Sequence, residues 1–272
     1  MSLSLSSILA KIQPGDKPNQ FITQFYPEWS QGRTSFGGFT AAQALQALRL
    51  GCEAELPLRS MMVNFISAAG PGTIEIQCEQ LHRGKSSTWA EARVSQAGKL
   101  IATVTVFFGK SRDSAITVDA PQRPEAPSPE QAPEVMGDNN PLAPIFTRNY
   151  QMRFALGQAP VSASADSQQG VWMRYRNREE PLGEAQLVAM LDLPPPAVMQ
   201  MFTEPKPISS ISWHIEFLDH LNDPHSDAYR GWWFMHSSAK ACADGYSQEH
   251  STLFTPSGRA IAMSQQTVAV YA

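Results

Sequence analysis

One acidic residue interrupts a strongly apolar stretch of the sequence. Asp192 lies within Leu-Val-Ala-Met-Leu-Asp-Leu-Pro-Pro-Pro, residues 187–196. An ionised carboxylate that is buried there without a partner would cost several kcal/mol. We therefore expect Asp192 to be paired, hydrated or chemically active. The alternative is an N-cap or turn residue ahead of the three prolines, where Asp is common.

A pair of glycines could bring backbone N–H groups close to a ligand. Gly37 and Gly38 precede an Ala- and Gln-rich segment, residues 39–48, that we expect to be a helix. Because glycine has no Cβ, the pair would let a negatively polarised atom approach the positive end of that helix. The alternative is a turn that needs glycine only for a positive φ.

Three basic side chains gather near the expected end of a strand. His82, Arg83 and Lys85 surround Gly84. Such a group suits the phosphates of a ligand, and the alternative is an exposed turn whose charges are simply solvated.

Several other chemistries lack the residues that they need. The six histidines form no pair at metal-ligand spacing, and none is so spaced from a cysteine, so no metal site is predicted. The G-x-S-x-G turn of α/β-hydrolases and the G-x-G-x-x-G nucleotide fingerprint are both absent from the sequence.

Composition narrows the class of protein. The chain has 272 residues, of which 42% are hydrophobic and 17% charged, as is typical of a folded protein. Its 21 Lys and Arg residues face 25 Asp and Glu residues, for a net charge of −4, and they form no basic block. Nucleic acid is therefore not an expected partner.

Cysteine usage and hydropathy bear on location. The three cysteines, Cys52, Cys78 and Cys242, are widely spaced and are expected to be buried free thiols in a reducing compartment. The first residues predict a short amphipathic helix rather than a signal peptide, and about 18 consecutive apolar residues occur nowhere. We expect a cytoplasmic location and no membrane span.

A proline-rich segment divides the chain into two similar halves. Seven prolines fall within residues 111–144, which predicts an extended linker between units 15–110 and 145–272. Each unit begins with a helix that is apolar nearly all round and continues with alternating strands. Turn signals at 96–99 and 255–258 separate the last two strands of each unit, so internal duplication is the economical explanation.

The ordered set of motifs resembles the type II acyl-CoA thioesterases, which have a double hot-dog fold. In the first half the resemblance rests on Phe36-Gly37-Gly38, Gln43, Phe65, and residues 81–86 and 98–103. In the second half it rests on Leu191-Asp192-Leu193, residues 214–217, Asp244-Gly245, residues 257–262 and Gln265-Gln266. The resemblance implies an α+β protein of two fused units, each with a central helix wrapped by a curved antiparallel β-sheet.

The same resemblance implies that the protein hydrolyses a fatty acyl-CoA to free acid and CoA, without a cofactor. Asp192 would activate the water, helped by the Gln266 amide and by the Ser210 hydroxyl, where the family can have Thr. Because strand alternation turns neighbours to opposite faces, a slip of one residue would exchange Gln266 with Gln265. Ser210 has the alternatives Ser209 and Ser212. Substrate-binding residues would be Gly37, Gly38, Phe39, Arg83 and Lys85.

Two other functions fit a hot-dog fold, because a fold alone does not fix chemistry. A non-catalytic acyl-CoA-binding protein would need only the pocket and the groove for CoA. A dehydratase would need a His beside the central helix, and neither predicted helix contains one. A dimer or tetramer is expected through outer sheet or helix surfaces, because the fused units already imitate a hot-dog dimer.

Overall fold

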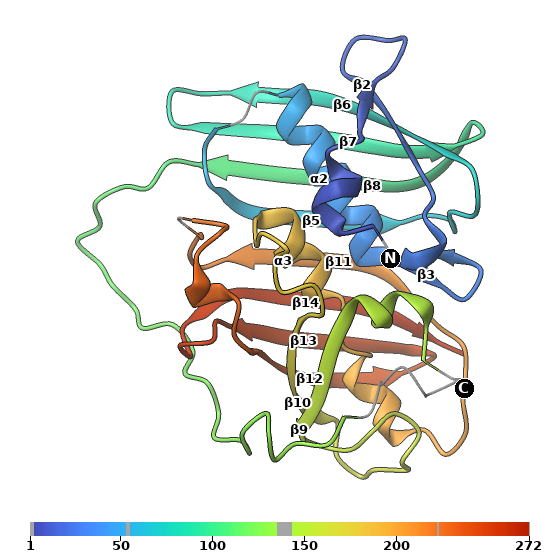
Figure 1. Ribbon diagram of the computed structural model, residues 1–272, viewed down its shortest axis with the longest axis vertical. Coiled ribbons are helices and arrows are strands. Elements are labelled where there is room, and N and C mark those ends of the chain that lie inside the picture. The colour runs from blue at the N-terminus through green and yellow to red at the C-terminus, as the bar shows by residue number, and fades with distance from the viewer. Residues whose placement is uncertain (1–2, 53–54, 135–142, 222, 272) are drawn as a thin grey trace.

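Twelve strands form one continuous antiparallel sheet in the computed structural model, which describes residues 3–52, 55–134, 143–221 and 223–271 (Figure 1). The strands of the first half are β1 (Gln13–Pro14), β2 (Gln20–Gln24), β5 (Leu58–Phe65), β6 (Thr73–Arg83), β7 (Ser87–Gln96) and β8 (Lys99–Gly109). Those of the second half are β9 (Tyr150–Leu156), β10 (Gln168–Tyr175), β11 (Ile208–Phe217), β12 (Trp233–Ala243), β13 (Tyr246–Phe254) and β14 (Ala260–Val270). A separate small ribbon joins β3 (Ser30–Gln31) to β4 (Thr34–Ser35).

The two halves repeat one topology, which confirms the predicted double hot-dog fold. The order β2-β6-β7-β8-β5 in the first half corresponds to β10-β12-β13-β14-β11 in the second. The halves meet where β5 and β11 pair antiparallel, with Met62 opposite His214. The predicted turn before β8 is also present, with positive φ at Ala97 and Gly98.

Three α-helices and four short 3₁₀ segments complete the described elements. The α-helices are α1 (Leu5–Leu9), α2 (Gly37–Gly51) and α3 (Glu184–Leu191). The 3₁₀ segments are η1 (Pro27–Trp29), η2 (Ile145–Asn149), η3 (Ala197–Met201) and η4 (Asp227–Tyr229). The sequence prediction of a short helix at the start is confirmed by α1, whose Leu5, Ile8 and Leu9 are buried.

Helices α2 and α3 pack against each other on the same side of the sheet (Figure 1). Small side chains such as Ala41, Ala44 and Ala47 are fully buried, which lets α2 approach both the sheet and α3. Phe39 fills the space beside its first turn and stacks on Trp29 at 5.2 Å between ring centroids. Burial on nearly all sides explains the absence of a polar stripe on this helix.

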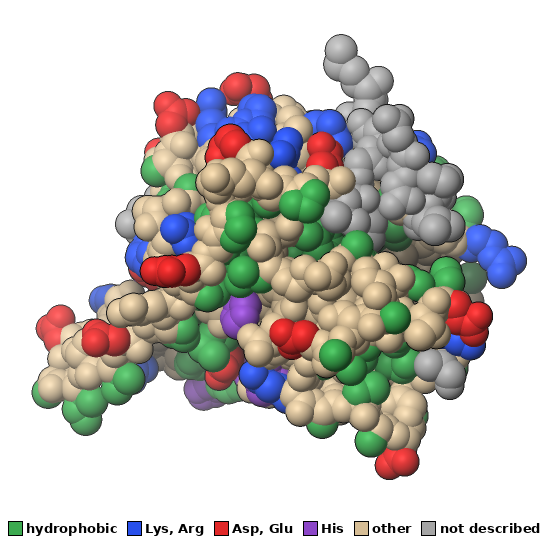
Figure 2. Space-filling view, turned by 90° about the horizontal axis from the view of Figure 1, so that it is seen from below, with side chains coloured by type: hydrophobic (Ala, Val, Ile, Leu, Met, Phe, Trp, Pro, Cys, Tyr) green, Lys and Arg blue, Asp and Glu red, His purple; other side chains and the backbone are tan. Residues whose placement is uncertain are grey.

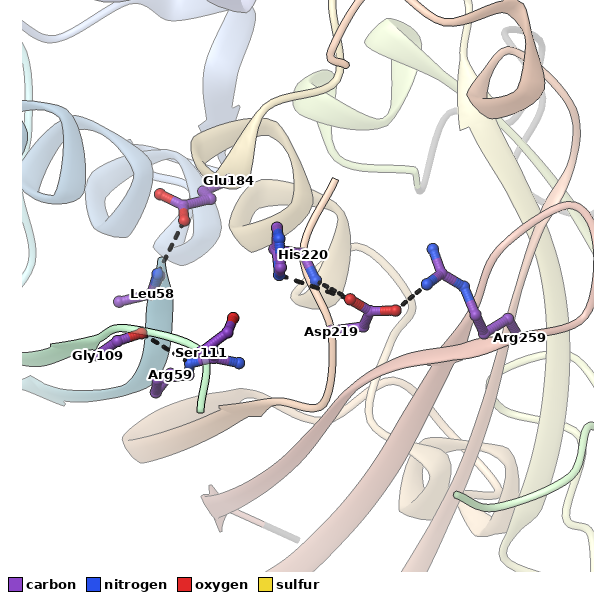
Figure 3. A network of polar contacts seen from close by, with 8 residues as sticks. All are labelled: Leu58, Arg59, Gly109, Ser111, Glu184, Asp219, His220 and Arg259. Carbon is purple, nitrogen blue, oxygen red and sulfur yellow. Dashed lines mark hydrogen bonds and ion pairs between the residues drawn. The ribbon is translucent and has the colours of Figure 1, made fainter. Parts of the chain in front are cut away.

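The two helices run in opposite directions, so each begins where the other ends. At one end α3 begins with Glu184, which accepts a hydrogen bond from Arg49 Nε, near the C-terminus of α2, at 3.0 Å. The Leu58 N–H of β5 donates to the other oxygen of Glu184 at 3.0 Å (Figure 3). At the opposite end, α3 stops at Asp192 beside the first residues of α2.

The later part of the proline-rich segment packs on the second unit. The Trp172 indole N–H donates to the Pro127 carbonyl at 2.8 Å, and Arg153 donates to the Pro129 carbonyl at 3.1 Å. Trp172 and Phe234 lie on the sheet face opposite α3, because their strand neighbours point into the core. Residues 135–142 of the predicted linker lie outside the described residues. The unit limits at 110 and 145 stay a prediction.

One cysteine differs from its prediction. Cys52 and Cys78 are buried free thiols, but Cys242 is exposed near the end of β12, where that strand runs out past the edge of the core. Burial raises the pKa of Cys78 to about 12. None of the described helices is long and apolar enough to cross a membrane. Figure 2 shows basic and acidic side chains interspersed on the face that it draws.

Candidate active site

The Asp192 carboxylate lies at the junction of the two units. Its Oδ2 accepts a hydrogen bond from the Gly38 N–H at 2.7 Å, and its Oδ1 accepts one from Gln266 Nε2 at 2.8 Å. Asp192 ends α3, but the bonds of its side chain go to α2 and β14. Asp192 follows α3 as its C-cap rather than as an N-cap, and its side chain also links α2 to β14.

Gly37 and Gly38 are required for close approach. A Cβ on Gly38 would lie 2.9 Å from Asp192 Cβ and 3.0 Å from the Ala189 carbonyl oxygen. A Cβ on Gly37 would lie 2.8 Å from Asp192 Oδ2. Neither glycine has a positive φ, so the alternative of a turn that needs glycine for its φ is wrong. The Gly37 N–H has no acceptor among the described residues and stays available at the positive end of α2.

Burial and hydrogen bonding together set the basicity of Asp192. Burial raises its pKa from 3.8 to about 6, and the bonds from Gln266 and the Gly38 N–H partly oppose that shift. No Lys, Arg or His of the described chain forms an ion pair with Asp192. A carboxylate held only by neutral donors keeps basicity that a guanidinium would remove.

A small cavity of about 20 Å³ opens beside Asp192. This space is sufficient for one water molecule with polar neighbours. The lining residues come from α3, from the segment that follows it and from strands β10 to β14: Gln169, Leu191, Asp192, Pro194, Pro195, Pro196, Ala197, Trp213, Met235, Ser237, Glu249, Ser251, Ser264 and Gln266. Both Asp192 and Gln266 therefore face the same enclosed space, whereas Gln265 is exposed.

The cavity includes a second carboxylate that sequence reasoning missed. Glu249 on β13 is 3% exposed. Its Oε2 accepts the Ala197 N–H at 2.9 Å and its Oε1 accepts the Ser247 hydroxyl at 2.5 Å. Burial raises its pKa, against the effect of these donors. The signal was a strand that is polar on both faces, Ser-Gln-Glu-His-Ser at 247–251, where a half-buried strand normally alternates.

Other predicted site residues lie elsewhere. Ser210 on β11 pairs with Val268 and is not among the residues that line the cavity. Phe39 is 1% exposed, and its ring belongs to the core.

The predicted phosphate-binding residues lie at the far end of the first unit. The Gly37 end of α2 lies beside Phe65 on β5. Strand pairing through β8 and β7 places Ile76 of β6 in the same row of the sheet as Phe65. Arg83 follows Ile76 by seven residues along β6, or about 23 Å of strand. Arg83, the last residue of β6, and Lys85, in the turn that follows, are both exposed there.

Two buried helices pack on one duplicated sheet, and the Asp192 carboxylate lies where they meet. This arrangement defines a double hot-dog protein. Residues 25–109 match the family model described as acyl-CoA thioesterase N-terminal domain. Residues 121–270 match the acyl-CoA thioesterase C-terminal domain. The chain belongs to this acyl-CoA thioesterase family and is a thioester hydrolase.

Solved structures show the same fold. A hot-dog protein of unknown function from Alicyclobacillus acidocaldarius is 23% identical, with a TM-score of 0.87 and coverage of 100% of this chain and 99% of that one. A putative thioesterase II from Thermobifida fusca is 18% identical, with a TM-score of 0.82 and the same coverage. The tesB protein of Mycobacterium avium subsp. paratuberculosis is 19% identical, with a TM-score of 0.78 and coverage of 99% and 100%. A search of curated proteins finds no match.

Proposed function

We propose that Asp192 is the general base in hydrolysis of an acyl-CoA thioester by this chain. The observation that carries the proposal is the hydrogen bond from Gln266 to Asp192 beside a cavity that has room for water. A base with a pKa near 6 is largely ionised at neutral pH and can still accept a proton in the transition state. Family resemblance implies a fatty acyl group as the part of the substrate that is released.

The reaction needs one water and no group outside the chain. Asp192 takes a proton from the water as its oxygen forms a bond to the thioester carbonyl carbon. The carbon–sulfur bond then breaks, and the proton held by Asp192 passes to the leaving CoA sulfur. Gln266 orients the Asp192 carboxylate, and its second amide hydrogen would hold the water.

Charge that develops on the carbonyl oxygen needs a donor. We assign this role to the Gly37 N–H, because Gly38 already donates to Asp192 and both lie at the positive end of α2. Phe39 would take part through its backbone, as a residue of the first turn of α2, and not through its ring. Arg83 and Lys85 stay proposed contacts for CoA phosphates, and Ser210 stays a proposed helper that holds the water.

A panel of acyl-CoA esters from short to long chain tests the proposal. Release of the free CoA thiol is followed with a colour reagent, and hydrolysis of at least one ester is expected. If no ester is hydrolysed while acyl-CoA still raises the melting temperature, the chain is a binding protein, since such stabilisation needs only preferential binding to the folded state.

Location and assembly are proposed on sequence grounds. We propose a cytoplasmic protein that forms a dimer or tetramer through its outer surfaces. Light scattering that finds only a 30 kDa species, close to the 29.9 kDa of one chain, would contradict the assembly.

A further inference from the structure

Strand β14 is polar beside the cavity, where the equivalent strand of the first unit is apolar. Strands β8 and β14 both follow a turn and carry an Ile-Ala pair near their start, at 101–102 and at 261–262. Counted from these pairs, Ser264 corresponds to Val104. Val104 is fully buried among apolar side chains, so the fold itself needs no hydroxyl at this position. A buried hydroxyl costs stability unless it is hydrogen-bonded, and Ser264 therefore needs a partner.

The other polar side chains that line the cavity are held by groups of the protein. Such bonds are made by Gln169, Asp192, Ser237, Glu249, Ser251 and Gln266. Ser264 has no hydrogen-bond partner among the described residues. The residue is 6% exposed, yet its hydroxyl oxygen keeps some accessible surface. Because Ser264 lines the cavity, that surface belongs to the cavity.

Ser264 and Gln266 lie on the same face of β14. They are two residues apart and pair with Ile215 and Trp213 of β11, which are both buried. Two residues of a strand span about 7 Å, so a water can lie between the hydroxyl and the amide and bond to both. A water in so small a cavity needs two to four polar partners.

The attacking water has two hydrogens and two lone pairs to place. In the proposed hydrolysis one hydrogen goes to Asp192, and one lone pair forms the bond to the thioester carbonyl carbon. The other lone pair would accept the second amide hydrogen of Gln266. The second hydrogen of the water still needs an acceptor, and Ser264 is the lining side chain whose capacity is unused.

We propose that the Ser264 hydroxyl accepts this second hydrogen and thereby aims the free lone pair of the water at the thioester. No covalent bond to Ser264 forms, and the proton transfers remain those of the proposed hydrolysis. The resemblance assigns a helper hydroxyl to Ser210, which does not line the cavity, whereas Ser264 does. The inference rests on the proposed function and adds a catalytic residue to it.

Variants of Ser264 test the inference on the best ester of the acyl-CoA panel. Ser264→Ala should lower kcat by about tenfold with KM nearly unchanged, because the loss affects only the orientation of the water. Ser264→Thr keeps the hydroxyl and should recover most of kcat, which a simple packing defect would not allow. Ser238→Ala is the matched control, since Ser238 is buried to a similar degree on the other face of the sheet, and it should keep wild-type kcat.

The outcomes separate this inference from the proposed function. If the wild type hydrolyses an ester and folded Ser264→Ala keeps its kcat, the inference is overturned and the hydrolysis stands. A larger loss in Ser210→Ala than in Ser264→Ala would overturn it as well. Should Ser264→Ala fail to fold, Ser264→Cys replaces it, because a thiol is only a weak hydrogen-bonding group, and kcat should fall.

A readout without turnover is a high-resolution crystal structure of the wild-type chain. A water within about 3.2 Å of both Ser264 Oγ and the Asp192 carboxylate is expected. A Ser264 hydroxyl bonded to another group of the protein would overturn the inference. If no ester is hydrolysed, the proposed function fails, and this structure alone decides whether Ser264 holds the water.

Discussion

The two ends of the α2–α3 helix pair carry similar groups in different settings. At each end a carboxylate from the second unit meets backbone or side-chain donors of the first. Glu184 is held by the Arg49 guanidinium at 2.5 Å and by the Leu58 N–H. Asp192 is held only by the Gly38 N–H and the Gln266 amide.

The two ends of the helix pair differ in the charge of the donors that hold their carboxylates. The Arg49 guanidinium forms an ion pair with Glu184, so this carboxylate joins the two units. Asp192 has neutral donors and a cavity beside it, and its pKa is raised. The strand position of Gln266 is occupied in the first unit by Val106, which offers no hydrogen bond. Among the described residues, the proposed site at Asp192 therefore has no counterpart at the Glu184 end.

The largest expected effect separates the two carboxylates by catalysis. Asp192→Asn keeps the shape and removes the basicity, so kcat should fall by about 10²–10⁴-fold with KM nearly unchanged. Glu184→Gln is the matched control at the other helix end and should keep kcat within about threefold. Wild-type turnover in folded Asp192→Asn, with folding checked by its melting curve, would show that the assignment is wrong.

Gln266 should have the next largest effect. Gln266→Ala removes the donor to Asp192 and should lower kcat by about 10- to 100-fold, as expected for a hydrogen bond to a charged group. Gln265→Ala, on the exposed face of the same strand, should leave kcat unchanged. Equal losses in both variants would indicate a general effect on β14.

Stability should respond in opposite directions at the two ends. Glu184→Gln weakens the bonds from Arg49 and Leu58 and should lower the free energy of unfolding by about 1–3 kcal/mol in urea titrations.

The folded-state pKa of Asp192, about 6, exceeds the ordinary 3.8, so its stabilising contribution is present at low pH and is lost as pH rises through that interval. Asp192→Asn should therefore gain stability relative to wild type between pH 4 and pH 7. A constant difference across this range would contradict the buried, unneutralised carboxylate.

The glycines at the helix ends provide a steric comparison. Gly38→Ala places a Cβ against Asp192 and the Ala189 carbonyl and should cost about 1–3 kcal/mol of stability. Gly183→Ala, which precedes α3, meets only the flexible Gln186 side chain at 3.1 Å and should be tolerated. Thermal unfolding of both variants tests whether close approach is confined to the Asp192 end.

The pH profile should show the smallest shift. The acid limb of kcat/KM should fall below a pH of about 6, where Asp192 takes up its proton. The hydrogen bond from Gln266 lowers the pKa of Asp192, so Gln266→Leu should raise that pKa and move the acid limb to higher pH. Glu184→Gln should leave the limb in place. An acid limb near pH 4 in the wild type would mean that another group titrates.

Sequence periodicity predicted the elements well because local patterns reflect burial. Apolar residues around α2 and α3 required wrapping, and alternation in β6 and β8 required a sheet with one buried face. The residue types at Ala97-Gly98 predicted the turn, and the repeated order of helix and strands predicted the duplication. The prediction that Cys242 is buried was wrong, because the length of β12 that extends beyond the core depends on the strands that pair with it.

The candidate site was only partly readable. The cost of burying Asp192 in an apolar segment indicated a special residue, and the sequence alone determined that much. Tertiary structure decided its partners, because the Gly38 N–H lies 154 positions away and reaches Asp192 only when the helices pack antiparallel. The same holds for the cavity beside Asp192, where Ser237, Ser251 and Ser264 from three strands converge through sheet pairing. Local sequence fixes which face a side chain takes, but distances between remote groups depend on how the elements pack.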